Sequence, residues 1–222
     1  MRDRVVPWLI AAVDETRLGR EDFPARLEGL LAAGCPTVLL RGGGLPARRL
    51  WEIAGAAVGR CRAHGAELWI GDRADIARAC GADAVQLPAR GLSTGGARRV
   101  VGPAMRVGRS VHSAAEAGAA AASGADHLLV GTVFATPSHP KVVPAGVELL
   151  AAVAAATTVP FLAIGGITPD TAAAVAVAGA RGVVAVRALW DAPDPAAAVA
   201  AFSVAFRSAF GRGRGEALHS PP

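Results

Sequence analysis

The residues best suited to chemistry follow two short apolar runs in the middle of the chain. His112 closes the run that begins at Met105, and an imidazole titrates near neutral pH, so it can remove and return a proton. A second run, His127 to Val133, opens into a loop with four polar side chains: Thr136, Ser138, His139 and Lys141. If both runs are parallel strands, their carboxyl ends place these side chains on one face of a sheet, where α/β proteins hold their chemistry. We expect His112 to be a general acid and base, against the alternative of a histidine hydrogen-bonded at a strand end.

Lys141 is the only lysine of the chain, whereas every other basic side chain besides histidine is arginine. A single lysine in this loop suggests a point charge for a phosphate, although chance retention explains it equally well. His139 lies in the same loop and could act similarly, and we expect Thr136 and Ser138 to contact the substrate.

The segment AIGGITPD, residues 163–170, predicts a phosphate site. Gly165 and Gly166 allow a phosphate to approach the backbone, and the following helix start supplies free N–H groups. The alternative is a tight turn that needs a flexible backbone. We favour phosphate because barrels often bind it after their last two strands.

Asp72 follows a predicted strand and could orient a substrate or bind Mg²⁺ together with a second carboxylate. The sequence offers no convincing second carboxylate nearby. Asp72 also has a structural explanation, as the N-cap of a helix that begins at Arg73. We therefore predict no metal and no cofactor.

Eight short apolar runs recur along the chain and must position these residues. They span Val5 to Val13, Thr37 to Arg41, Glu67 to Gly71, Asp83 to Leu87, Met105 to Arg109, His127 to Val133, Pro160 to Ile164 and Gly182 to Val186. Unbroken apolar runs are typical of parallel strands buried on both faces. Helix-like segments separate them, so we predict a single (β/α)8 TIM barrel over residues 1–210 and a mobile tail over 211–222.

Composition narrows the class of partner. Hydrophobic residues make up 52% of the 222 residues and the net charge is +5. The arginines are scattered rather than clustered with aromatic residues, so we expect an anionic small molecule and no nucleic acid. No apolar run is long enough for a signal peptide or a membrane span, and we expect a cytoplasmic protein. The sequence leaves a homo-oligomer open.

Several motifs between residues 37 and 189 resemble, in order, those of the thiamine phosphate synthase and TenI family. They read VLLRGGG, IGDRADIARACGADAVQL, VGRSVHSAAEAGAAAASGADHLLVGTVFATPS, PFLAIGGITPD and GVVAVRAL. The resemblance implies a TIM barrel of thiamine biosynthesis with one of two activities. The synthase joins a pyrimidine pyrophosphate to a thiazole phosphate with Mg²⁺, and the TenI-type tautomerase aromatises the thiazole phosphate with a histidine and no metal.

Departures from the synthase motifs favour the tautomerase. The synthase lysine after Arg41 falls on Gly43, its Asn-Asp pair on Gly71 and Asp72, and its second Mg²⁺ ligand on Gly91. The segment RSVHS, by contrast, resembles the tautomerase version and places the proton-shuttling histidine on His112.

We therefore expect an isomerase acting on a thiazole phosphate carboxylate, with His112 moving the proton and Arg41 binding the carboxylate. The resemblance places the phosphate-loop lysine of the family on His139. The expected phosphate-binding residues are Gly165, Gly166, Val186 and Arg187. Two alternatives stay open: a Mg²⁺-dependent synthase, and a non-catalytic relative that binds a phosphate ligand.

Overall fold

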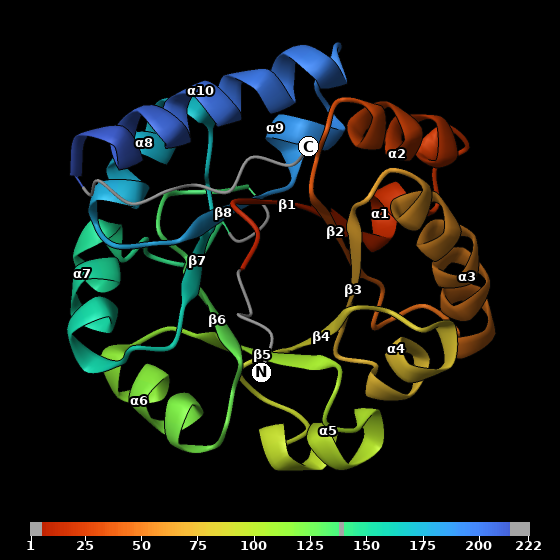
Figure 1. The fold of residues 1–222 in the computed structure, drawn as a ribbon, viewed down its shortest axis with the longest axis horizontal. Helices are drawn as coiled ribbons and strands as arrows, with labels where there is room; N and C mark the ends of the chain where they lie inside the picture. The colour runs from red at the N-terminus through yellow and green to blue at the C-terminus, as the bar shows by residue number, and fades with distance from the viewer. Residues whose placement is uncertain (1–5, 138–139, 214–222) are drawn as a thin grey trace.

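The computed structural model describes residues 6–137 and 140–213, which form a closed barrel of eight parallel strands surrounded by helices (Figure 1). The strands are β1 (Leu9–Asp14), β2 (Thr37–Arg41), β3 (Glu67–Gly71), β4 (Ala84–Leu87), β5 (Arg106–Val111), β6 (His127–Val130), β7 (Phe161–Ile164) and β8 (Gly182–Ala185). The helices are α1 (Glu15–Leu18), α2 (Phe23–Ala32), α3 (Ala47–Ala63), α4 (Ala74–Cys80), α5 (Thr94–Val101), α6 (Ala114–Ala122), α7 (Gly146–Ala156), α8 (Pro169–Val177), α9 (Arg187–Trp190) and α10 (Pro195–Gly213). The predicted TIM barrel is confirmed.

Each strand pairs in parallel with the next along the chain, and β8 closes the barrel on β1 through the register Leu9↔Val183. The predicted runs match the strands to within one or two residues at most ends, with larger differences at two. β1 begins at Leu9 rather than Val5, and β6 ends at Val130, so Gly131 to Val133 already belong to the loop. Pro7 lacks the N–H that a ladder hydrogen bond requires, which explains the late start of β1.

The strands are apolar on both faces because they separate two hydrophobic layers. In β1, Leu9, Ala11 and Val13 pack toward the helices, whereas Ile10 and Ala12 face the barrel interior. The interior layer is filled by a small set of residues: Val6, Ile10, Ala12, Leu39, Trp69, Ala84, Leu129, Leu162 and Val184. The interior is a packed core, so any cavity must lie above it, at an end of the barrel.

Glycines after three of the helices mark the ends of repeating strand–helix units. Gly81, Gly124 and Gly179 follow α4, α6 and α8 with φ of 70°, 81° and 102°, a left-handed backbone that favours glycine. α10 runs to Gly213, whereas we expected a tail from Gly211, and the remainder of that tail lies outside the described residues. No helix in the described part of the chain is long and apolar enough to cross a membrane.

Candidate active site

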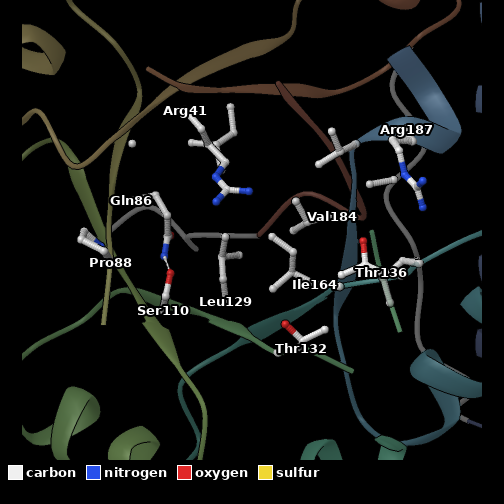
Figure 2. Close-up of a pocket in the computed structure, with 18 of the residues that line it drawn as sticks. Arg41, Gln86, Pro88, Ser110, Leu129, Thr132, Thr136, Ile164, Val184 and Arg187 are labelled. Carbon is white, nitrogen blue, oxygen red and sulfur yellow. Dashed lines mark hydrogen bonds between the residues drawn. The ribbon is translucent and has the colours of Figure 1, made fainter. Parts of the chain in front are cut away.

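A cavity of about 580 Å³ opens at the carboxyl ends of the strands (Figure 2). Eight of the predicted site residues line it: Arg41, Asp72, His112, Thr136, Gly165, Gly166, Val186 and Arg187. Lys141 is exposed and does not line the cavity, and Ser138 and His139 lie outside the described residues. The barrel thus brings together side chains from β2, β3, β5, β6, β7 and β8.

Two arginines line this cavity on different walls. Arg41 ends β2 and Arg187 begins α9 directly after β8, and Figure 2 shows the two guanidinium groups well separated. Both residues are exposed, and neither has a hydrogen bond or an ion pair to any residue that the structure describes. Unpaired guanidinium groups suit bidentate binding of phosphate or carboxylate groups.

Asp72 has a left-handed backbone conformation, which a role as helix N-cap would not require. Its φ is 65°, the only positive value at a non-glycine residue among those described. The N-cap of α4 is Arg73, and no side chain caps this helix, so the predicted capping role of Asp72 is wrong. A left-handed conformation costs of the order of 1 kcal/mol at a non-glycine residue and is typical of functional sites.

Glycines surround the Asp72 carboxylate where side chains stand in the synthase motifs. A Cβ atom at Gly91 would lie 3.6 Å from Asp72 Oδ1, and one at Gly43 would lie 3.9 Å from Oδ2. A Cβ atom at Gly71 would lie 3.7 Å from Cγ of Arg41. A side chain at Gly43 or Gly91 would therefore contact the Asp72 carboxylate, whereas one at Gly71 would lie 3.2 Å from the Leu40 carbonyl oxygen.

His112 lines the cavity with its ring anchored to the next strand. Its Nδ1 donates a hydrogen bond to the carbonyl oxygen of Gly131, and its backbone N–H donates to the Glu116 carboxylate over 2.7 Å. The ring therefore links the end of β5 to the loop that follows β6.

The glycine pair after β7 is required by close packing. Gly165 and Gly166 have φ of 102° and 65°, and a Cβ atom at either would lie 2.6 Å from Thr132 Cγ2 or from the Ala135 carbonyl oxygen, respectively. This contact supports the turn that we considered as the alternative to phosphate binding. The pair also lines the cavity, so the phosphate role stays a prediction.

Sequence reasoning missed Glu15, whose carboxylate lines the cavity and accepts a hydrogen bond from the Gly44 backbone N–H over 2.5 Å. The signal was its place directly after the first strand.

A chain of hydrogen-bonded polar side chains that leads from the cavity wall into the barrel interior was also missed. Gln86 Nε2 donates to Ser110 Oγ over 3.1 Å, and Gln86 Oε1 lies 3.0 Å from Nε2 of His127, which is fully buried. His127 opens β6 at the end remote from the loops, so its position in the sequence predicts no link to the site. The link exists because its ring extends along the barrel interior toward β4.

His127 should make the fold sensitive to acid. Burial, with a smaller contribution from Arg106, lowers the pKa of the His127 imidazole to about 3, from an unfolded value near 6.5. The unfolded chain then binds this proton more tightly, so its contribution to stability is present above pH 6.5 and falls as the pH drops toward 3. We expect a loss of about 2 kcal/mol between pH 7 and pH 5, measured by urea unfolding.

The control for this prediction is His127→Phe, which has no titrating ring. Its unfolding free energy should fall less than that of the wild type over the same range. Equal pH dependence in the two proteins would refute the assignment.

The described residues contain no group of three or more His, Cys, Asp or Glu side chains that could bind a metal ion. Two carboxylates, Glu15 and Asp72, nevertheless line the cavity. Mg²⁺ is commonly bound through one or two carboxylates together with substrate phosphates. The donor set therefore fits a Mg²⁺ ion that arrives with a phosphorylated substrate, and does not resemble an all-protein metal cage.

Comparisons with known proteins agree on one family. A family model described as thiamine monophosphate synthase matches residues 9–189. Thiamine-phosphate synthase of Acidothermus cellulolyticus is 40% identical over 197 residues, covering 88% of this chain and 93% of that protein. The thiamine biosynthesis bifunctional protein ThiM/ThiE of Symbiobacterium thermophilum is 41% identical over 85% of this chain, which spans only 39% of that protein.

A solved structure agrees with these relatives. Thiamine phosphate pyrophosphorylase from Pyrococcus furiosus superposes with a TM-score of 0.81 at 29% identity, over 92% of this chain and 98% of that chain. Its coverage extends over nearly the whole barrel.

These comparisons correct the predicted activity. The expectation of a thiazole tautomerase is wrong, because relatives about 40% identical over most of the chain are named thiamine-phosphate synthases. The prediction gave too much weight to Gly43, Gly71 and Gly91, three positions around one carboxylate. A cation held largely by substrate phosphates needs few protein ligands, so such losses are weak evidence against a synthase. The chain belongs to the thiamine monophosphate synthase family of enzymes.

Proposed function

We propose that this enzyme is a transferase of the thiamine-phosphate synthase type, which joins hydroxymethylpyrimidine pyrophosphate to a thiazole phosphate. The observation that carries the proposal is that Arg41 and Arg187 lie on separate walls of one cavity, with no hydrogen bond or ion pair to any described residue. The reaction brings together two substrates that each bear a phosphate group. Two separated cationic groups suit such a pair better than they suit one small anion.

Arg41 serves the pyrophosphate. It ends β2 beside β3, the strand that presents Asp72, and its guanidinium points into the cavity (Figure 2). In the reaction the thiazole nitrogen forms a C–N bond to the methylene carbon of the pyrimidine, and the C–O bond to pyrophosphate breaks. The electron pair of that bond leaves with pyrophosphate, so donors fixed at the leaving oxygens stabilise the transition state.

Arg187 serves the phosphate of the thiazole. It follows β8 next to Val186, and the adjacent β7 leads to Gly165 and Gly166; all four residues line the cavity. Thr136 completes this wall from the loop after β6. A guanidinium donates up to five hydrogen bonds in a planar fork, which suits the oxygen atoms of a phosphate group.

Asp72 after β3 and Glu15 after β1, which both line the cavity, would hold a Mg²⁺ ion delivered with the pyrophosphate. When bound, the ion neutralises charge that develops on the leaving pyrophosphate. Asp72 binds and orients this end of the substrate, and its left-handed backbone holds the carboxylate at the cavity wall.

Asp72→Asn should therefore weaken the dependence on the ion as well as the rate. We expect kcat/KM to fall about tenfold to hundredfold and the Mg²⁺ concentration for half-maximal rate to rise, because one anionic oxygen ligand is lost. Steady-state rates over a Mg²⁺ titration measure both. Glu52→Gln, which changes an exposed carboxylate of α3 outside the cavity, is the control, and an Asp72→Asn enzyme with the wild-type Mg²⁺ curve would contradict the assignment.

The proposal is tested by release of inorganic pyrophosphate from the purified protein with both substrates and Mg²⁺. Release should require all four components and should stop when either substrate is omitted. Release that does not depend on the thiazole phosphate would indicate hydrolysis of the pyrimidine pyrophosphate by water instead of transfer. No release above the protein-free mixture would refute the transferase.

A further inference from the structure

We propose that Gln86 and His127 are positioning residues that fix the Ser110 hydroxyl as a hydrogen-bond donor into the cavity, toward an anionic oxygen of the bound substrate. The inference rests on the proposed function and names a specific device within that site. Ser110 and Gln86 line the cavity, and Figure 2 shows the hydrogen bond between their side chains at the cavity wall. His127 lies beneath them and is fully buried.

The protonation of His127 decides which groups donate and which accept in the hydrogen bonds that join His127, Gln86 and Ser110. Burial keeps this ring neutral, so only one of its nitrogens carries a hydrogen. Nδ1 has no hydrogen-bond partner among the described residues, and Nε2 lies 3.0 Å from Gln86 Oε1. A buried N–H without an acceptor is rarer than a buried acceptor without a donor, so the hydrogen belongs on Nε2.

The orientation of the Gln86 amide follows. Its oxygen accepts from His127 Nε2, and its nitrogen donates to Ser110 Oγ over 3.1 Å and to the Leu87 carbonyl oxygen over 3.4 Å. The carbonyl contact independently requires a nitrogen on this side of the amide. Ser110 Oγ is thus an acceptor within the protein, and its own hydrogen is available for a ligand.

The hydrogen bond between His127 and Gln86 requires a glycine on the adjacent strand. Gly108 of β5 faces this hydrogen bond, and a Cβ atom there would lie 2.0 Å from His127 Nε2 and 2.2 Å from Gln86 Oε1. Any other residue would occupy the space of the hydrogen bond itself.

The ring of Trp69 packs against the ring of His127. The Trp69 ring lies 4.3 Å from it between centroids, and Trp69 Nε1 donates to Glu67 Oε2 over 2.9 Å. Arg106 lies 5.1 Å above the Trp69 ring and pairs with the same carboxylate. These contacts fix the ring plane, so the direction of the chain is built in before a substrate binds.

A fixed donor at this wall suits a phosphate oxygen, which accepts hydrogen bonds and has none to donate when ionised. Arg41 approaches the same cavity from β2 (Figure 2). We therefore assign the Ser110 donor to the pyrophosphate rather than to the thiazole phosphate, whose wall is formed by β7 and β8.

The test is a double-mutant cycle on binding, with inorganic pyrophosphate and Mg²⁺ titrated into the full-length protein by calorimetry. Ser110→Ala and Gln86→Met should each weaken binding about fivefold to tenfold, and the double variant should lose no more than either single variant. His127→Phe should give a smaller loss in the same direction, because it frees the Gln86 amide to rotate. Leu162→Met, a change of similar size in the interior layer, should leave the affinity unchanged.

Steady-state kinetics provide the second readout. Ser110→Ala and Gln86→Met should raise the KM for the pyrimidine pyrophosphate and leave the KM for the thiazole phosphate unchanged. Additive losses in the cycle, or unchanged pyrophosphate affinity in Ser110→Ala, would overturn the inference. A wild-type protein that releases no pyrophosphate from its substrates would instead refute the proposed function, so the two failures are distinguishable. If Gln86→Met does not fold, His127→Phe and Ser110→Ala complete the same cycle.

Discussion

The Arg41→Ala variant is expected to lose about a hundredfold to a thousandfold in kcat/KM for hydroxymethylpyrimidine pyrophosphate, the range typical for a lost transition-state donor. The guanidinium has no partner among the described residues, so its removal leaves no protein group unpaired and should not destabilise the fold. The loss should fall on kcat more than on the KM for the thiazole phosphate, because the leaving charge develops only in the transition state.

Two variants control this prediction. Arg41→Lys keeps the charge without the planar fork and should recover part of the rate. Arg49→Ala removes an exposed arginine of α3 outside the cavity and should behave as wild type. An Arg41→Ala enzyme within fivefold of the wild type would show that the pyrophosphate binds elsewhere.

The second large effect is expected at Gly108→Ala, which should destabilise the fold by about 2 to 3 kcal/mol. The added methyl would lie within 2.2 Å of both His127 and Gln86, so either the strand shifts or their hydrogen bond breaks. Urea unfolding at pH 7 measures the loss. The same variant should also raise the KM for the pyrimidine pyrophosphate, because the Ser110 hydroxyl loses its fixed partner.

Gly118→Ala provides the matched control. Gly118 lies inside α6, and a Cβ atom there meets nothing within 4 Å, so the change should stabilise the protein by about 0.5 to 1 kcal/mol. Equal urea midpoints for the two glycine variants would contradict the predicted cost of a methyl group at Gly108.

The architecture could be predicted because its signals are local and repeated. Each strand is buried on both faces, so it appears in the sequence as a short unbroken apolar run, as at Phe161–Ile164. Glycines such as Gly124 mark the helix ends at a regular interval. The position of His112, Asp72 and Arg187 at one end of the barrel then follows from strand direction alone.

Other features depend on contacts between distant segments, which no local pattern records. Asp72 has a left-handed backbone and does not cap the helix as predicted. The ring of His127 contacts Gln86, which lies 41 positions away in the sequence. Glu15 joins the cavity only because α1 begins directly at the barrel rim. These residues were missed or misread because their roles arise from closure of the barrel.

The choice between two activities of one family was the least predictable step. The prediction of a tautomerase depended on a few substituted positions, whereas the similarity over most of the chain points to the synthase. Substitutions such as Gly91 in place of a carboxylate alter how strongly a cation is held, which is a matter of degree, and so they discriminate poorly between reactions.

The most direct test of the central claim is phosphorus NMR of the wild-type protein with hydroxymethylpyrimidine pyrophosphate, thiazole phosphate and Mg²⁺, with Arg41→Ala in parallel. We predict that the resonances of thiamine phosphate and inorganic pyrophosphate grow in equal amounts with the wild type, and far more slowly with the variant. A folded wild-type protein that leaves both substrates unchanged, or consumes one of them alone, would contradict the account.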